Sequence, residues 1–449
     1  MGHRGWTVVL GLVLGVWLPA TVRAGNVAVS VQGGALIIKG DDGSNGITID
    51  DAGLAVGELR VTPSGGTTVN GAGVAVFPSI VGDLRVTMGV GEDSVILTDI
   101  AVLGDVVVKM GGGSDSVSIM GGGTGGAARV DLGGGVDGFA MNGSSIAGGD
   151  LRIKGGNGSD SLSVSGSLIA GNLTLESGAG PNGLVVSGCS IGEDLIVKGG
   201  KESDSVGVNG CAIGGAATLT LGAGVNGLSL NGNAVGGMLT MKGGKESDSV
   251  GVIGCAIGED ATLTLGAGVN GLSLNGNAIG GTLTVKGGKE SDSVAVTGCA
   301  IGEDMTLTLG AGVNGLAITG SAVAELGIKG GKESDSISIN DTAMGREAKI
   351  DLGAGINGLS MGTGNSLSGD LIVKGKGGDD IVSLTNWTAQ QDVTFKLGSG
   401  NNDLALTTMH ILGDLTVKTG SGSDTINLDA SIIDGTTSID TGSGMDSVT

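Results

Sequence analysis

The sequence predicts an all-β fold, a parallel β-helix or β-solenoid, with about 22 residues and three short strands in each coil. Three observations lead to this prediction. Apolar residues recur about every 22 positions, they alternate with other residues inside each unit, and 97 of the 449 residues are glycine. A constant period of this size indicates short strands separated by tight turns that stack into a solenoid.

The longest series of recurring apolar residues predicts about 17 coils. Its members are Val95, Val117, Phe139, Leu162, Leu184, Val206, Leu228, Val250, Leu272, Val294, Leu316, Ile337, Leu359, Ile381, Leu404, Ile426 and Val448. A second series begins at Ile191 and a third at Val197, with the same spacing. Each series is expected to become one row of stacked side chains inside the solenoid.

Apolar residues inside a unit follow the period of a β-strand. Val206 and Val208 are two residues apart, as are Leu219 and Leu221, and this spacing places both members of a pair on one face of a strand. The stretches between them are too short for a helix of 10–15 residues, which argues against a leucine-rich repeat. Seventeen coils stacked about 4.8 Å apart would form a rod roughly 80 Å long.

The chain divides into three parts. Residues 1–24 have the pattern of a secretory signal peptide, because Arg4 precedes the apolar run from Thr7 to Trp17 and Ala24 offers a cleavage position. Residues 25–90 fit the period poorly, and we expect irregular coils that cap one end of the rod. Residues 91–449 are predicted to be the regular β-solenoid. No stretch after residue 24 is long and apolar enough to be a transmembrane segment, so we expect a secreted or cell-surface protein.

Composition excludes several classes of protein. Asp and Glu number 45 against 23 Lys and Arg, which gives a formal charge of −22, and such a charge argues against nucleic acid as a partner. Glycine does not recur at every third position, which excludes collagen. A hydrophobic content of 39% is too high for a disordered acidic tail, and 1% aromatic residues is too low for an ordinary enzyme core.

A row of acidic and amide residues accompanies the longest apolar series. The residue two positions before each apolar member is always Asp or Asn, and Gly lies four positions before that polar residue. The polar row consists of Asp93, Asp115, Asp137, Asp160, Asn182, Asp204, Asn226, Asp248, Asn270, Asp292, Asn314, Asp335, Asn357, Asp379, Asn402, Asp424 and Asp446. Stacked carboxylates repel one another, so an unbroken run of Asp favours a bound cation.

The unit that contains this row resembles the RTX, or hemolysin-type, calcium-binding repeat. The likeness is clearest in residues 111–117, 156–162 and 420–426, each of which reads G-x-G-x-D-x-apolar. It departs from that family in its period near 22, in six Asn replacements and in its signal peptide. The resemblance implies Ca²⁺ on the intact units, through Asp93, Asp115, Asp137, Asp160, Asp424 and Asp446.

A second interpretation of the same row needs no metal. Asp and Asn favour tight turns, and Gly supplies positive φ angles, so a ladder of turn residues is stable without a ligand. In the centre of the chain Asp alternates with neutral Asn, and the segment Lys198–Ser205 recurs 44 residues later from Lys242 and again from Lys286. Lys and Glu in these copies come close to balancing the charge of Asp204 and its equivalents.

Two further rows give weaker signals. Cys189 and Cys211 are one coil apart, which is within disulfide range, whereas Cys255 and Cys299 are two coils apart and cannot bridge. A threonine row consists of Thr218, Thr240, Thr262, Thr284 and Thr306. Regular threonine arrays resemble ice-binding solenoids, but Lys alternates with Thr two residues further on and spoils the uncharged face that those proteins need.

The function expected from these features is a non-enzymatic structural or surface role, with adhesion as one form of it. The pattern resembles long bacterial surface β-helix proteins and autotransporter passengers. The alternative is a carbohydrate-active β-helix enzyme, a polysaccharide lyase or hydrolase. Such an enzyme needs a local cluster that breaks the repeat and aromatic platforms for sugar, and His410 is isolated. We therefore expect no enzymatic activity and a partner at the cell surface or in the matrix.

The last residues suggest one more partner. The sequence ends at Thr449, part-way through a coil, and an exposed strand edge recruits other strands. End-to-end self-association is the corresponding expectation.

Overall fold

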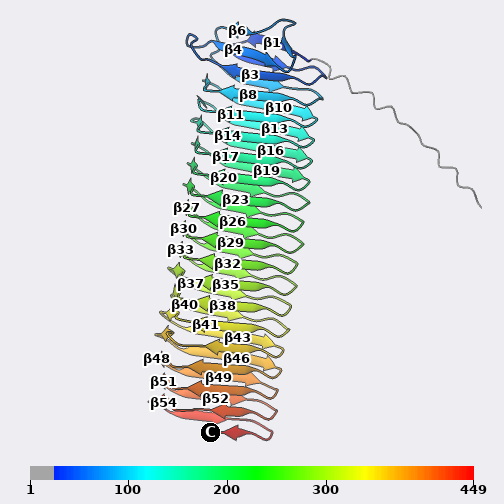
Figure 1. Ribbon diagram of the computed structural model, residues 1–449. Helices are drawn as coiled ribbons and strands as arrows, with labels where there is room; N and C mark the ends of the chain where they lie inside the picture. The colour runs from blue at the N-terminus through cyan, green and yellow to red at the C-terminus, as the bar shows by residue number, and fades with distance from the viewer. Residues whose placement is uncertain (1–24) are drawn as a thin grey trace, which may run out of the picture.

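A computed structural model describes residues 25–449 as one straight stack of β-coils (Figure 1). The predicted signal peptide, residues 1–24, lies outside the described residues. Within the described part all 56 regular elements are strands and none is a helix. This part of the chain also contains no helix that is long and apolar enough to cross a membrane. The predicted all-β parallel solenoid is confirmed.

Each coil contributes one strand to each of three parallel sheets, which we call sheets I, II and III. In one central coil these are β22 (Leu195–Lys198), β23 (Ser205–Asn209) and β24 (Ala212–Ile213), and β25 (Ala217–Thr220) begins the next coil. We call the connection from sheet I to sheet II turn 1. The next coil repeats the pattern in register, since Val206 pairs with Leu228 and Ile213 pairs with Val235.

Seventeen strands of sheet II mark the 17 predicted coils. They are β8 (Ser94–Thr98), β11 (Ser116–Met120), β14 (Gly138–Asn142), β17 (Ser161–Ser165), β20 (Gly183–Ser187), β23, β26 (Gly227–Asn231), β29 (Ser249–Ile253), β32 (Gly271–Asn275), β35 (Ser293–Thr297), β38 (Gly315–Thr319), β41 (Ser336–Asn340), β44 (Gly358–Met361), β47 (Ile381–Thr385), β50 (Asp403–Thr407), β53 (Thr425–Asn427) and β56 (Ser447–Val448).

One member of the predicted apolar row is wrong. Leu359 pairs with Val382, which is fully buried, whereas Ile381 is 56% exposed. The cause is an extra residue before β47. The pairing of β43 (Ala348–Ala354) with β46 (Leu371–Gly377) shifts register, and Gly353 and Ala354 face Gly375 and Gly377. Lys376 is the inserted residue, and it displaces the following side chains by one position.

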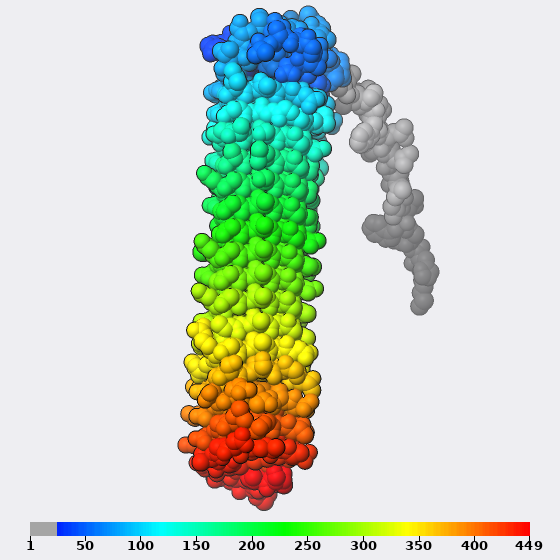
Figure 2. Space-filling view, turned by 90° about the vertical axis from the view of Figure 1, so that its left-hand side faces the viewer, coloured from blue at the N-terminus to red at the C-terminus, as the bar shows by residue number. Residues whose placement is uncertain are grey.

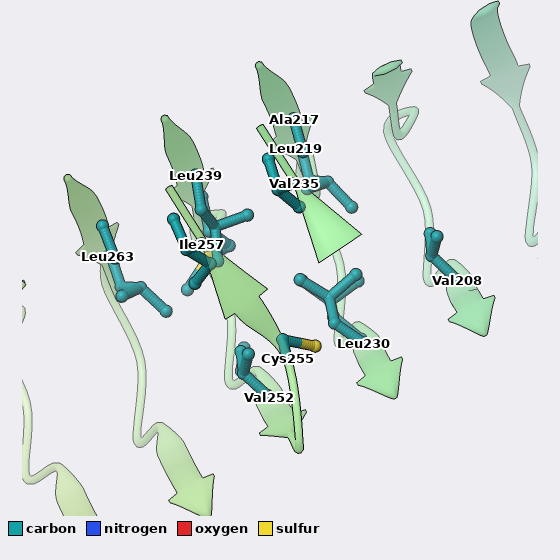
Figure 3. Packing of buried hydrophobic residues seen from close by; sticks show 14 of the residues in the cluster. Val208, Ala217, Leu219, Leu230, Val235, Leu239, Val252, Cys255, Ile257 and Leu263 are labelled. Atoms are coloured by element: carbon teal, nitrogen blue, oxygen red, sulfur yellow. The ribbon is translucent and has the colours of Figure 1, made fainter. Parts of the chain in front are cut away.

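The interior of the rod is a single column of small aliphatic side chains. Alternate residues of all three sheets point inward, and Figure 3 shows Leu219, Leu230 and Val235 packed together from three strands. Full burial of one such side chain contributes roughly 1.5–3 kcal/mol, and each coil repeats this contribution. The narrow interior explains the low aromatic content, since Phe395 is one of the few large rings it holds.

Residues 25–90 contain the antiparallel strands of the described chain. β1 (Asn26–Gln32) forms a hairpin with β2 (Ala35–Lys39), and β3 (Gly46–Asp50) pairs antiparallel with β4 (Leu59–Ser64). β4 also pairs antiparallel with β6 (Ala75–Phe77), and β5 (Thr68–Val69) runs beside β1. β2 and β3 then lead into the parallel stack through β7 (Leu84–Thr87) and β8.

Candidate functional site

The polar residue of turn 1 points into the rod in almost every coil. Asp115, Asp204 and Asn226 are each at least 97% buried, whereas Asp446 in the last coil is only partly buried. The predicted row is therefore a real column of stacked side chains. Its first member is Asn45, which the sequence analysis missed because residues 25–90 depart from the period.

One hydrogen bond repeats along the whole column. The backbone N–H of each member donates to Oδ1 of the member in the following coil, from Asn45 to Asp93 through to Asp424 and Asp446. The 17 donor–acceptor distances lie between 2.7 and 3.2 Å. This ladder satisfies one buried backbone donor in each coil, which is a structural role for every Asp and Asn in it.

The register shift near residue 376 also changes one member of the predicted row. Asp380, not Asp379, belongs to the ladder, because Asn357 donates to its Oδ1 at 3.2 Å and its own N–H donates to Asn402 at 3.2 Å. Asp379 instead accepts the backbone N–H of Asn401 in the outer part of the turn. The same single-residue insertion that buries Val382 therefore buries Asp380.

The central Asp residues have hydrogen-bond partners for both carboxylate oxygens. Oδ1 of Asp248 accepts the backbone N–H and the side-chain Nδ2 of Asn226, at 3.1 and 2.9 Å. Its Oδ2 accepts the N–H of Gly244 at 2.7 Å. The other members with this arrangement are Asp204, Asp292 and Asp335. Alternation of Asn with Asp thus supplies a donor for each buried charge.

Lysine does not balance these central charges directly. Lys198 is exposed and forms its ion pair with Glu176, at 3.0 Å, on the outside of sheet I. Asp204 is enclosed in turn 1 and is held by the N–H of Gly200 and by Asn182. The predicted balance of charge in the centre is therefore achieved by neutral donors rather than by lysine.

Six Asp residues have a buried Oδ2 without a hydrogen-bond partner among the described residues. They are Asp93, Asp115, Asp137, Asp160, Asp380 and Asp424. Five of the six predicted calcium ligands belong to this group, and the sixth, Asp446, is partly exposed. The unbroken Asp run, together with Asp380 and Asp424 near the C-terminal end, therefore differs from the central coils in one specific way, namely a buried Oδ2 without a hydrogen-bond partner.

Strand length explains this difference at three of these residues. β10 (Val106–Gly112), β13 (Ala128–Gly134) and β16 (Leu151–Asn157) each extend over seven residues, and the Gly residues before each Asp pair with the neighbouring strand. The central strand β22 stops at Lys198, which leaves the N–H of Gly200 free to donate to Asp204. Extending the sheet therefore removes the donor that would have satisfied Oδ2.

Burial raises the pKa of these carboxyl groups. The pKa of Asp115 rises to about 6, mainly through burial and further through the charges of Asp93 and Asp137. The pKa of Asp160 also rises to about 6 for the same main reason. Burial likewise raises the pKa of Asp93 and of Asp137. A proton or a cation would stabilise such groups.

The donor set at this edge consists of hard oxygens. Six coils of the ladder each offer one buried carboxylate oxygen without a hydrogen-bond partner. Across residues 25–449 no three His, Cys, Asp or Glu side chains come together as a group able to hold a metal ion. The turn carbonyls would therefore have to complete any Ca²⁺ shell, which needs six to eight oxygens.

A second ladder lies at the corner between sheets III and I, and the sequence analysis missed it. Here the direction is reversed, because the N–H of Asp105 donates to Oδ1 of Asp83 in the preceding coil at 2.9 Å. These carboxylates are more exposed, and the same hydrogen bond lowers the pKa of Asp83. The signal was a partial Asp and Asn row that includes Asp150, Asn172 and Asp194.

The cysteine row lines the corner between sheets II and III. All four cysteines are free thiols and are buried. The N–H of Cys211 donates to Oδ1 of Asn233, and that of Cys255 donates to Asn277, both at 2.9 Å. This row is therefore a third polar column that holds backbone groups inside a turn.

Comparison with known proteins adds no relative. No protein-family model, no curated protein and no solved structure matches the chain. The resemblance to RTX repeats consequently depends on the turn motif alone.

Proposed function

We propose that this protein is an exported, non-enzymatic rod that acts as a structural or adhesive element at the cell surface or in the matrix. One observation carries the proposal: the central coils are near-copies, so the rod presents the same surface again and again (Figure 2). A repeated surface suits multivalent attachment, in which many weak contacts add up. An active site would instead require one coil that differs from its neighbours.

The side chains that could serve in catalysis or in sugar binding also favour a non-enzymatic role. The described histidine, His410, lies 3.1 Å from Asp434 in an exposed position. Trp387 and Phe395 are buried, so neither offers a platform for sugar rings. An ice-binding role is not proposed, because Lys242 and Lys286 lie in register with Thr264 beside the threonine row.

A deletion tests the rod function. Removing residues 221–264 joins Thr220 to Leu265, which restores the Thr-Leu sequence and the alternation of coils. We expect a folded rod shorter by about 10 Å, the width of two strand spacings, that still attaches to the cell surface. Small-angle scattering measures the length, and protease accessibility on intact cells measures surface display. A deleted chain that folds but no longer attaches would contradict a repeated attachment surface.

The enzyme alternative has its own test. The purified chain is incubated with neutral and acidic polysaccharides, and new reducing ends or unsaturated sugars are measured. We expect neither product. Steady release of oligosaccharides would replace the scaffold proposal with a lyase or hydrolase.

The unpartnered Asp oxygens favour a second candidate, Ca²⁺ binding along turn 1. We expect calorimetry at pH 7 to detect Ca²⁺ binding that is lost in the double variant Asp115→Asn/Asp137→Asn. The control Glu246→Gln/Glu290→Gln removes the same charge from exposed positions of turn 1 and should leave binding unchanged. Absence of heat together with an unchanged melting temperature would exclude the metal and leave the proton as the ligand of these carboxyls.

A further inference from the structure

The outward surface of sheet I concentrates the positive charge of an acidic protein. We call this surface the basic face and define it by the exposed cationic side chains in the two outward rows of sheet I, the rows that contain Arg152 and Lys154. They are Lys39, Arg85, Lys109, Arg129, Arg152, Lys154, Lys198, Lys242, Lys286, Lys329, Lys349, Lys374, Lys396 and Lys418. These 14 residues are two thirds of the 21 Lys and Arg that remain when Arg4 and Arg23 are subtracted from the total of 23.

Few acids lie in the same two outward rows, although a row of Asp residues borders them at the corner with sheet III. The two outward rows of sheet I contain four acidic residues, Asp131, Glu176, Asp351 and Asp440. The rest of the described chain therefore carries 41 of the 45 acids and only seven of the 21 cations. The rod has a positive face although its net charge is strongly negative, and this separation of charge depends on the fold.

Parallel register turns the lysines into a row. Lys242 and Lys286 both pair with Thr264, so they lie two strand spacings apart, about 9.6 Å. Near the C-terminal end Lys374, Lys396 and Lys418 pair directly across β46, β49 (Val393–Gly398) and β52 (Leu415–Thr419). Like charges at this spacing repel one another, and a bound anion would relieve that repulsion.

Many of these lysines have no ionic partner in the rod. Arg152 and Lys198 share Glu176, and Lys349 pairs with Glu325 and Glu347. By contrast, no Asp or Glu of residues 25–449 forms an ion pair with eight of the cations. They are Lys109, Lys154, Lys242, Lys286, Lys329, Lys374, Lys396 and Lys418.

Hydroxyl groups and two hollows accompany the charges. Thr394 and Thr416 lie in the outward row beside the C-terminal lysines, and Thr218 belongs to the same kind of row in the centre. A hollow of about 290 Å³ lies at Gly327, and its lining includes Lys329, Lys349, Lys374 and one acid, Asp351. A second hollow, of about 220 Å³, lies among Lys109, Arg129, Arg152 and Lys154, with Asp131 as its one acid.

We propose that the basic face binds an extended acidic polysaccharide along the rod axis. Lysines would pair with its carboxylate or sulfate groups, and threonine hydroxyls would hydrogen-bond to its sugar hydroxyls. A single-stranded nucleic acid fits less well, because sheet I presents no exposed aromatic ring on which bases could stack. The inference rests on the adhesive form of the proposed function and names the chemical class of its partner.

The test uses polygalacturonate and the purified chain. The variant Lys374→Gln/Lys396→Gln/Lys418→Gln removes three charges from the basic face. The matched control Lys201→Gln/Lys245→Gln/Lys289→Gln removes three exposed lysines from turn 1. We expect the first variant to bind polygalacturonate about tenfold more weakly and the control to bind like the wild type. The unchanged chain should also lose affinity as salt rises from about 50 to 200 mM.

Each other outcome overturns the proposal. An equal loss of affinity in both variants would indicate general electrostatic attraction and no specific site. Absence of binding at low salt would exclude acidic glycans as the partner while leaving the proposed rod function intact. Tighter binding of poly(dT) than of polygalacturonate would identify nucleic acid instead. Removal of the stacked charges should not unfold the chain, and an unchanged melting temperature checks this for the variant.

Discussion

The coils that carry Asp93 to Asp160 and the coils that carry Asp204 to Asp335 build the same ladder in different surroundings. In both regions a backbone N–H donates to Oδ1 of the next coil. In the first region Oδ2 is buried without a partner, whereas in the second region a glycine N–H satisfies it. Asp therefore occurs in two environments in one fold. In one, both carboxylate oxygens accept hydrogen bonds, and in the other, one buried oxygen has no hydrogen-bond partner.

The two regions also use different backbones in turn 1. Gly111 and Gly113 both have positive φ angles, 114° and 134°. The equivalent positions in the central coil that carries Asp248 are Gly244 and Glu246, and neither has a positive φ angle. The longer strands of the first region continue the sheet into the turn, and only glycine allows coils to approach that closely.

The largest expected change in stability comes from substituting Gly113 in turn 1 of the first region. Gly113→Ala places a Cβ against the carbonyl oxygen of Gly91 and forces a positive φ on alanine. We expect a loss of about 3 kcal/mol in the free energy of unfolding, confined to the adjacent coils. Glu246→Ala at the same turn position should change stability by less than about 0.5 kcal/mol. Residue-resolved amide hydrogen exchange measures the stability change of both variants. Equal changes would mean that the two turns do not differ in their need for glycine.

An Asp→Asn substitution should lower the free energy of unfolding in the central region and raise it in the first region. Asp248→Asn places an amide against the N–H of Gly244, and we expect a loss of about 2 kcal/mol. Asp137→Asn removes an unpartnered carboxylate and adds a donor that can reach the Gly135 carbonyl, as Asn226 reaches Gly224 at 2.8 Å. We expect a gain of about 1 kcal/mol. Denaturant unfolding followed by local exchange tests this, and a loss in both variants would contradict it.

The two regions should also differ in the pH dependence of their stability. A carboxyl whose pKa is raised to about 6, as in Asp115 and Asp160, binds more protons when folded than when unfolded, where the pKa is about 3.9. Stability of the first region should therefore fall as pH rises from about 4 to 6, while the centre changes less. Amide hydrogen-exchange rates measured as a function of pH, and corrected for the intrinsic pH dependence of exchange, check this. An equal change of stability with pH in both regions would contradict the prediction.

The sequence showed the period and the strands, but it could not show which Asp is satisfied. Asp115 and Asp204 occupy the same slot of the repeat, and both follow glycines. Their difference depends on where the preceding strand ends, at Gly112 in one coil and at Lys198 in the other. Strand ends are set by hydrogen bonds to the neighbouring coils, so a single unit carries too little information to fix them.

Insertions limited the prediction in a second way. The apolar pattern placed Ile381 inside, since isoleucine and valine are adjacent and both suit the core. The structure places Val382 inside because Lys376 adds one residue to the turn, and this choice also buries Asp380 in place of Asp379. A one-residue shift exchanges the two faces of a strand, and only pairing with adjacent coils selects between them.

By itself the sequence determined the all-β class, the period near 22 residues, the three strands per coil and the column of Asp and Asn. These follow from local spacing, which parallel stacking copies from coil to coil. The tertiary structure decided which carboxylates lack a partner, where the register shifts, and that 14 cations share one face of an acidic rod. Those properties depend on contacts between coils, because a side chain's surroundings in a solenoid come mainly from the turns above and below it.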